Sequence, residues 1–169
     1  MTQSLTLRLA RPEDLSAVDT LLARSFPRLL AKDYPPSIMV TIVPILSRAR
    51  PDLLASGRYF VVEDTAGRVL GAGGYSLPRR KPVGLAGPAT ASIRHVATDP
   101  DAIRQGIGAR VMQAIFAAAG AEGVTSYDCL STLTAVPFYA AQGFLAIGPV
   151  EVPMRPALSF RAMRMVRPA

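Results

Sequence analysis

The fold is decided by one stretch of sequence, which reads Ile93-Arg94-His95-Val96-Ala97-Thr98-Asp99-Pro100-Asp101-Ala102-Ile103-Arg104-Gln105-Gly106-Ile107-Gly108-Ala109. A strand predicted over 91–98 stops at Asp99-Pro100, and apolar residues at helical spacing predict a helix over 107–121. The first amides of a helix have no partner within it, and the helix dipole makes that end positive. Gly106 and Gly108 let a ligand approach closely. The stretch therefore predicts a site for an anion such as a pyrophosphate.

Two other glycine motifs do not fit this loop. The third glycine of a dinucleotide-binding fingerprint would fall at Val111. A P-loop needs Lys followed by Ser or Thr after the glycines, and neither stands there. Arg104 and Arg110 add positive charge near the start of the helix. A plain turn that begins a helix is the alternative that these residues leave open.

The rest of the chain predicts a mixed sheet. Further strands are expected over 5–9, 58–63, 68–76, 124–130, 144–150 and 160–166. Helical segments are expected from Pro12 onward, over 35–49 with a break at Pro44, over 51–56 and over 134–142, and 78–88 is expected to be a loop. This order favours an α/β domain with antiparallel and parallel strand pairs, in which the unit over 91–130 crosses over right-handed. The cluster Gly71-Ala72-Gly73-Gly74 lies within a strand and indicates a bulge or a close approach.

The composition bounds the class of protein. A chain of 169 residues, half of them hydrophobic, fits one domain over 1–169 with its own core. One cysteine allows no disulfide framework, and one histidine with one cysteine makes a metal site unexpected. No apolar run approaches the ~20 residues of a membrane helix, so a cytoplasmic location and no membrane partner are expected. The net charge of +7 favours an anionic ligand. The alternative is a compositional bias of the genome, since Arg, Ala, Pro and Gly are all abundant in this sequence. Nucleic-acid binding lacks support because the arginines are scattered and no aromatic residues interleave with them.

A second motif lies in the segment 131–144, which contains Phe138-Tyr139-Ala140-Ala141-Gln142-Gly143-Phe144. Together with Ile103-Arg104-Gln105-Gly106-Ile107-Gly108, it resembles the GNAT superfamily of acetyl-CoA-dependent N-acetyltransferases. The signature of that superfamily is Arg/Gln-x-x-Gly-x-Gly/Ala at the start of a helix, and Ile103 departs from it. The resemblance covers most of the chain and is weakest over 27–57.

The resemblance implies a fold, a cosubstrate and site residues. The fold would be a mixed, mainly antiparallel sheet of about six to seven strands flanked by helices, with a parallel strand-helix-strand unit for acetyl-CoA. Backbone groups of Val96, Ala97 and Thr98 would meet the pantetheine arm. The pyrophosphate would be wrapped by Arg104, Gln105, Gly106, Ile107, Gly108 and Ala109. Tyr139 would be the general acid, since a phenol is protonated at neutral pH, and Thr132, together with Ser131, is placed to bind substrate or pantetheine.

The general base stays open. The positions at which relatives carry a glutamate correspond to Ser92 and Tyr127, and neither is a ready base. Asp128, His95 and Glu63 are substitutes, although strand alternation places His95 on the face opposite Val96. A water chain or an amine that arrives neutral is an equal alternative. Cys129 could carry the acetyl group as a thioester, but a small core residue on a buried strand is the favoured interpretation.

The expected activity is acetyl transfer to a primary amine within a ternary complex. A non-catalytic acyl-CoA-binding module that acts as a sensor or interaction domain is the alternative. The acceptor, a small-molecule amine or a protein or peptide amine, would meet the segments 26–51, 77–88 and 151–159. A homodimer is possible.

Overall fold

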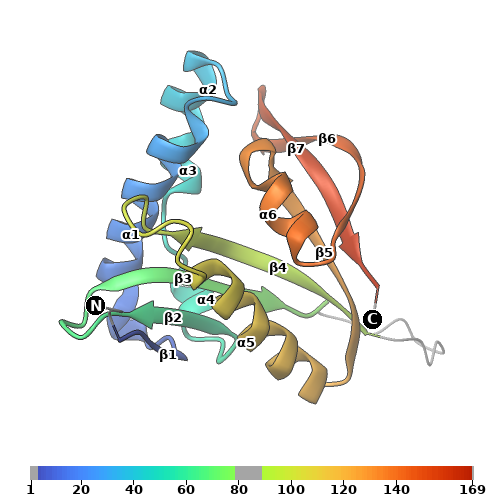
Figure 1. Cartoon of the computed structure of the whole chain (residues 1–169). Helices are drawn as coiled ribbons and strands as arrows, with labels where there is room; N and C mark the ends of the chain where they lie inside the picture. Colours follow the sequence, from blue (N-terminus) through green and yellow to red (C-terminus); the bar gives the residue numbers. More distant parts are fainter. Residues whose placement is uncertain (1–3, 79–88, 169) are drawn as a thin grey trace.

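One seven-stranded sheet forms the centre of the protein (Figure 1). The computed structural model describes residues 4–78 and 89–168. The strands follow the order β1-β2-β3-β4-β5-β7-β6 across the sheet, and all neighbours are antiparallel except β4 and β5. The predicted mixed, mainly antiparallel sheet with one parallel strand-helix-strand unit is therefore confirmed.

The bounds of the elements follow the predicted order. The strands are β1 (Thr6–Leu9), β2 (Tyr59–Glu63), β3 (Val69–Ser76), β4 (Ala89–Thr98), β5 (Val124–Thr132), β6 (Leu145–Arg155) and β7 (Leu158–Arg167). The helices are α1 (Leu15–Leu30), α2 (Pro36–Thr41), α3 (Val43–Leu46), α4 (Pro51–Leu54), α5 (Ile107–Ala121) and α6 (Val136–Ala141), with 3₁₀ turns η1 (Pro12–Asp14) and η2 (Leu133–Ala135). The loop expected over 78–88 lies, from residue 79 on, outside the described residues.

Helices cover both faces of the sheet. Along β2, Phe60 and Val62 belong to the hydrophobic cluster under α5 and α6, whereas Tyr59 and Val61 belong to the cluster under α1 and α4. Alternate residues of a strand point to opposite faces, so α1 and α4 lie on one face, and α5 and α6 lie on the other. We call these the α1 face and the α5 face.

Helix α5 lies very close to β3. A Cβ atom at Gly73 would come within 2.8 Å of Val111, and one at Gly71 would overlap Ile107. The glycine cluster is therefore a close-approach site, as predicted, because only glycine leaves room for the helix. The register against β4 also shifts here: Ala72 is opposite Ala97, but Gly74 is opposite Arg94. Strand β4 thus holds one extra residue in a β-bulge.

The sheet forks between β4 and β5. Parallel pairs run from Ala89–Val124 to Ser92–Asp128 and then stop, although β4 continues to Thr98 and β5 to Thr132. Each strand remains paired on its outer side, β4 with β3 and β5 with β7. Figure 1 shows the two strands diverging. Backbone groups of β4 on the side of the fork have therefore lost their partner strand.

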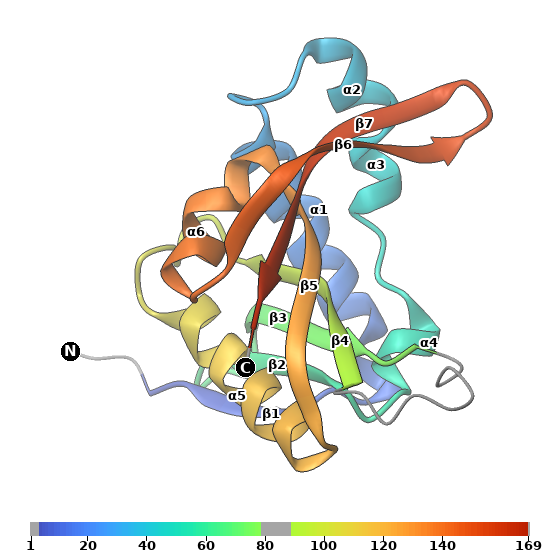
Figure 2. The same cartoon turned by 90° about the vertical axis from the view of Figure 1, so that its right-hand side faces the viewer.

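Strands β6 and β7 are longer than the sequence predicted. They form a hairpin through the segment 151–159, which packs apolar residues such as Val152 and Phe160 against α2 and α3 (Figure 2). Pro153 argues against a strand beyond Val150 in the sequence, but β6 is an edge strand, where proline is tolerated.

Two predictions about the setting of the chain stay untested. Among the described residues, no helix is long and apolar enough to cross a membrane. A cytoplasmic location and one domain over 1–169 stay predictions.

Candidate active site

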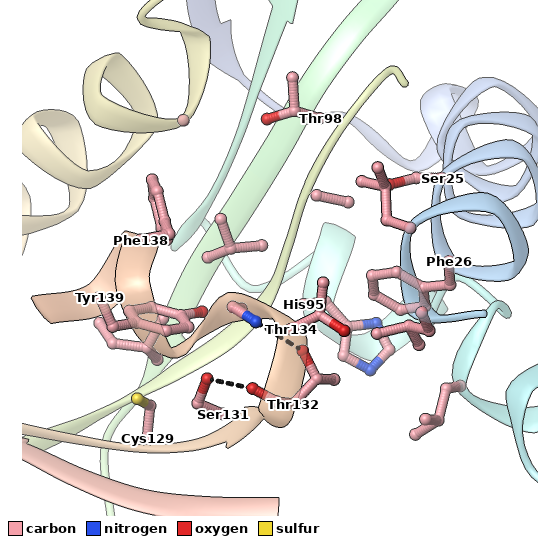
Figure 3. A pocket seen from close by; sticks show the side chains of 18 of the residues that line it. Ser25, Phe26, His95, Thr98, Cys129, Ser131, Thr132, Thr134, Phe138 and Tyr139 are labelled. Carbon is pink, nitrogen blue, oxygen red and sulfur yellow. Dashed lines mark hydrogen bonds between the residues drawn. The ribbon is translucent and has the colours of Figure 1, made fainter. Parts of the chain in front are cut away.

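A cavity of about 340 Å³ lies in the fork between β4 and β5 (Figure 3). Its walls come from α1, β4, the start of α5, the end of β5, and α6. The predicted residues Val96, Ala97, Thr98, Gly108, Thr132 and Tyr139 all line it. The fork thus brings together the two motifs of the sequence, although they are more than 20 residues apart in the chain.

The first turn of α5 presents unpaired amides. The first hydrogen bond of the helix runs from the Arg110 amide to the Gly106 carbonyl at 3.0 Å, so the preceding amides have no acceptor within the helix. No side chain caps this end within the described part of the chain. Arg104 and Gly106 both have left-handed backbone (φ 63° and 75°), and both are exposed, as is Gln105. The positive end of the helix is therefore open to an anion.

The two glycines of the motif have different physical roles. Gly106 has nothing within 4 Å of its Cβ position, and its positive φ is the feature that favours glycine. A Cβ atom at Gly108 would come within 2.8 Å of the Phe138 ring, so Gly108 lets α6 pack against α5. The side chain of Ile107 is buried in the core, so only its amide is available to a ligand. Ala109 is half-buried beside it.

Ion pairs hold the loop between β4 and α5 against α1 and β3. The Asp99 carboxylate is buried, bonds Arg68 at 2.8 Å, and lies 3.6 Å from Arg24. Asp101 binds both Arg24 at 2.8 Å and Arg28 at 3.0 Å. Burial alone would raise the pKa of Asp99, but the hydrogen bond from Arg68 and its charge hold that pKa below its usual range. Asp99 is therefore a carboxylate at neutral pH.

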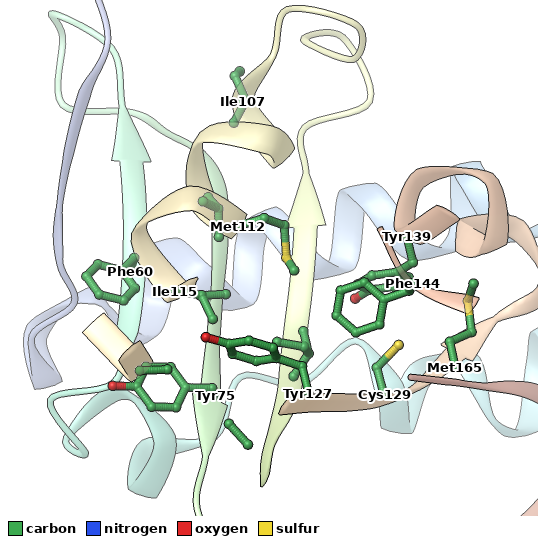
Figure 4. Close-up of a cluster of buried hydrophobic side chains, with 14 of the residues drawn as sticks. Phe60, Tyr75, Ile107, Met112, Ile115, Tyr127, Cys129, Tyr139, Phe144 and Met165 are labelled. Atoms are coloured by element: carbon green, nitrogen blue, oxygen red, sulfur yellow. The ribbon is translucent and has the colours of Figure 1, made fainter. Parts of the chain in front are cut away.

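Tyr139 projects its hydroxyl into the cavity (Figure 3). The ring is buried and packs edge-on against Phe144, with 5.4 Å between centroids, beside Cys129 (Figure 4). Burial raises the pKa of the phenol, so it is neutral at physiological pH and able to donate a proton. Burial likewise raises the pKa of the Cys129 thiol to about 12.

His95 also lines the cavity, and it does so from the α1 face, whereas Val96 packs on the α5 face, as strand alternation predicts. His95 is the residue of the β4 bulge with left-handed backbone (φ 46°). Both His95 and Val96 line the cavity because the cavity extends through the fork from one face of the sheet to the other. Burial, with the charges of Arg50 and Arg94, lowers the pKa of the imidazole to about 4. It is a neutral hydrogen-bonding group at physiological pH.

The other base candidates are placed elsewhere. Glu63 binds Arg8 at 2.9 Å at the end of β2 and does not line the cavity. Tyr127 is buried and packs against Phe116, with ring centroids 4.9 Å apart. Ser92 and Asp128 line a neighbouring hollow instead. Among the described residues that line the cavity, none is a carboxylate.

Hydroxyl side chains add polar groups to the lining, among them those of Ser25, Ser131 and Thr132. Ser131 donates to the Thr132 carbonyl at 2.7 Å, and the Thr132 hydroxyl accepts from the Ala135 amide at 3.3 Å. Ser25 of α1 is 1% exposed, and its hydroxyl has no hydrogen-bond partner within the described residues. Sequence reasoning missed Ser25, although a polar residue between Leu22 and Phe26 on an apolar helix face was a signal.

A family model for the acetyltransferase (GNAT) domain matches residues 55–145, more than half of the chain. The chain belongs to the GNAT acetyltransferase family. The matched range contains the fork, the whole of α5 and Tyr139. The resemblance drawn from the two motifs is thus confirmed.

Solved structures share the fold of this GNAT chain. A GCN5-related N-acetyltransferase from Rhodopseudomonas palustris is 20% identical, with a TM-score of 0.77 over 100% of this chain and 99% of that one. The PaiA N-acetyltransferase from Thermoplasma acidophilum, solved in complex with coenzyme A, is 12% identical, with a TM-score of 0.72 over 98% and 99% of the two chains. The ribosomal-protein-S18-alanine N-acetyltransferase from Escherichia coli is 16% identical, with a TM-score of 0.62 over 98% and 94%. A search of the curated proteins gave no match.

We find no candidate metal site among the described residues of this GNAT chain. No three of their His, Cys, Asp or Glu side chains lie close enough together to hold a metal ion.

Proposed function

We propose that this GNAT domain transfers the acetyl group of acetyl-CoA to a primary amine by direct attack within a ternary complex. The observation that carries the proposal is the cavity in the fork. It extends from Gly108 and Tyr139 on the α5 face to Phe26 and Leu29 on the α1 face. A thioester and an amine can therefore meet in it from opposite faces of the sheet.

The residues present fit coenzyme A. The uncapped amides of Ile107, Gly108 and Ala109 suit a pyrophosphate, and the exposed Arg104 adds positive charge. Val96 to Thr98 line the fork where β4 has lost its neighbour β5, so their backbone groups are available to the amides of the pantetheine arm. Bound acetyl-CoA would supply an activated acetyl thioester.

Tyr139 is the general acid in this proposal. Transfer forms a C–N bond and breaks the C–S bond of the thioester. The amine nitrogen releases one proton to solvent, and the sulfur receives one from Tyr139, which regains it from solvent. A phenol kept neutral by burial is suited to protonate a departing thiolate. Backbone amides of β4 in the fork would polarise the carbonyl.

Cys129 does not support a covalent route. A thiolate, and not a thiol, is the effective nucleophile, and the raised pKa of Cys129 keeps it a thiol at neutral pH. Cys129 is also 4% exposed. Direct attack by the amine is therefore the route we propose.

The test is an assay of CoA release from acetyl-CoA with a panel of amines, run beside calorimetric titration with CoA. We expect CoA to bind and at least one amine to accelerate its release over buffer. Binding of CoA without turnover of any amine would favour the non-catalytic module, which the lack of a lining carboxylate among the described residues supports. Failure of CoA to bind would contradict both.

A further inference from the structure

A second hollow, of about 370 Å³, adjoins the fork. It is lined by Ser92, Ile93, Arg94, His95, Asp128, Cys129, Leu130 and Arg164. Four of these residues, Ile93, His95, Cys129 and Leu130, also line the first cavity. The hollow begins at the last parallel pair, Ser92 with Asp128, and reaches β7 at Arg164, which is paired with Leu130. The two spaces are therefore neighbouring parts of one site.

The hollow opens on the α1 face. Ile93 and Cys129 belong to the core under α5 and α6. Because side chains alternate along a strand, their neighbours Arg94 and Leu130 point to the opposite face, and Arg164 shares that face with its pair partner Leu130. This is the face from which the amine would approach under the proposed function.

The charge of the hollow is positive. Arg94 and Arg164 are both exposed, and neither has an ion-pair partner among the described residues. Asp128 is the one carboxylate among the described residues of the lining. Elsewhere, arginines such as Arg58 and Arg68 are paired with carboxylates at 2.7–2.8 Å. Two unpaired guanidinium groups, on the strands that flank β5, are suited to bind a carboxylate.

The first cavity is apolar on the same face. Phe26, Leu29, Leu46 and Phe160 form that wall, and none of the described residues lining this cavity is Asp, Glu, Lys or Arg. His95 stands between the apolar wall and the two arginines, since it lines both spaces. A neutral imidazole nitrogen can accept a hydrogen bond from an amine.

We propose that the acceptor is an amino acid or amino-acid derivative with an apolar side chain, whose carboxylate is bound by Arg94 and Arg164 and whose amino group lies beside His95. This inference rests on the proposed function for the choice of an amine. It adds two requirements for the acceptor, which are a carboxylate and an apolar side chain.

The test compares three amines that share one side chain: L-leucine, L-leucinamide and isoamylamine. With the full chain and acetyl-CoA, we expect kcat/KM for L-leucine to be at least about tenfold higher than for the two amines that lack a carboxylate. A tenfold ratio is about what one good charged hydrogen bond contributes. Arg94→Gln and Arg164→Gln should each reduce this preference. Arg11→Gln, which removes an exposed arginine from the start of η1, is the matched control and should keep it. Turnover of the neutral amines with no preference for L-leucine would overturn the inference and leave the proposed function standing.

A binding measurement tests the inference even without turnover. Calorimetric titration of the CoA-bound protein with L-leucine should show binding that Arg94→Gln weakens about tenfold. Absence of binding to the wild-type chain, or equal binding by the variant, would overturn the inference. Absence of turnover with binding intact would instead count against the proposed function alone.

Discussion

Ser92 and Asp128 are the last residues paired in parallel between β4 and β5, and the proposed site lies where the strands separate beyond them. The fork needs no unusual residue at its origin. It arises because β4 stays paired with β3 and β5 stays paired with β7 while the two halves of the sheet diverge. The gap exposes unpaired backbone to a ligand and joins the two faces of the sheet.

Tyr139→Phe should lower kcat by about 10²–10⁴-fold, the usual contribution of a general acid, because the phenol in the fork is the proton donor that we propose. The affinity for CoA should be largely kept, because the ring stays in place. Steady-state kinetics and calorimetry measure the two effects. Tyr127→Phe is the matched control: this buried tyrosine donates only a long bond of 3.4 Å to the Phe116 carbonyl and should keep turnover. Normal kcat in Tyr139→Phe would refute the acid assignment.

Gly108→Ala should destabilise the protein by about 1–3 kcal/mol, because a Cβ atom there meets the Phe138 ring at 2.8 Å. It should also weaken CoA binding, since Gly108 lies at the mouth of the fork. Gly120→Ala, in the same helix with nothing within 4 Å, should instead raise stability by about 0.5–1 kcal/mol. Urea unfolding measures both. Equal effects of the two substitutions would contradict the packing described for Gly108.

Asp99→Asn should lower stability by about 1–3 kcal/mol at pH 7, because the amide leaves Arg68 without a buried carboxylate partner. The direction of the pH dependence follows from the lowered pKa of Asp99 in the folded protein. The contribution of the Asp99 carboxylate to stability is fully present above the pKa of the unfolded chain, about 3.9, and is lost as pH falls through the pKa of the folded protein. The loss of stability on substitution should therefore shrink in acid. Thermal unfolding at pH 7 and pH 3 measures it, and a difference that does not change with pH would contradict this account.

His95 should make the protein less stable as pH falls from about 6.5 toward about 4. The unfolded chain takes up a proton on this histidine in that range, whereas the folded chain does so only near the lower value, so acid favours unfolding. His95→Gln should lose less stability than wild type between pH 7 and pH 5. Thermal unfolding of both proteins at each pH measures the difference. Parallel losses would show that His95 is not held neutral.

Ser25→Ala should leave stability unchanged or slightly raised, because the hydroxyl is buried without a partner among the described residues. If the hydroxyl binds acceptor or acyl group in the cavity, KM for one of the two substrates should rise about fivefold, the value of one neutral hydrogen bond. Ser47→Ala is the contrasting variant, since the Ser47 hydroxyl donates to the Val43 carbonyl at 2.7 Å outside the cavity. Unchanged KM for both substrates would mean that Ser25 has no ligand role.

Local sequence signals were sufficient for the order of the elements and for the loop before α5. The period-two and helical patterns on either side of Gly106 predict a strand and a helix from neighbouring residues alone. The glycines of β3 likewise predict a close approach, and these predictions agree with the structure. The bulge at His95 left no such signal, because a residue other than glycine holds the left-handed backbone there. The extension of β6 beyond Val150 was hidden by Pro153, which an edge strand tolerates.

The walls of the cavity were harder to predict for a different reason. Ser25 and Tyr139 line the same space, and Asp101 is anchored by Arg24 and Arg28, although these residues are far apart in the chain. Such contacts depend on how α1 crosses the sheet, which no local pattern reports. The candidate acid was predictable only because it lies within a recognised motif.

The central claim is that coenzyme A binds in the fork with its pyrophosphate at the first turn of α5. An NMR titration of the ¹⁵N-labelled chain with CoA tests it most directly. The amides of Ile107, Gly108 and Ala109, together with those of Val96 to Thr98, should shift, and those of the β6–β7 hairpin tip near Ala157 should not. Shifts confined to other parts of the chain, or none at saturating CoA, would contradict the claim.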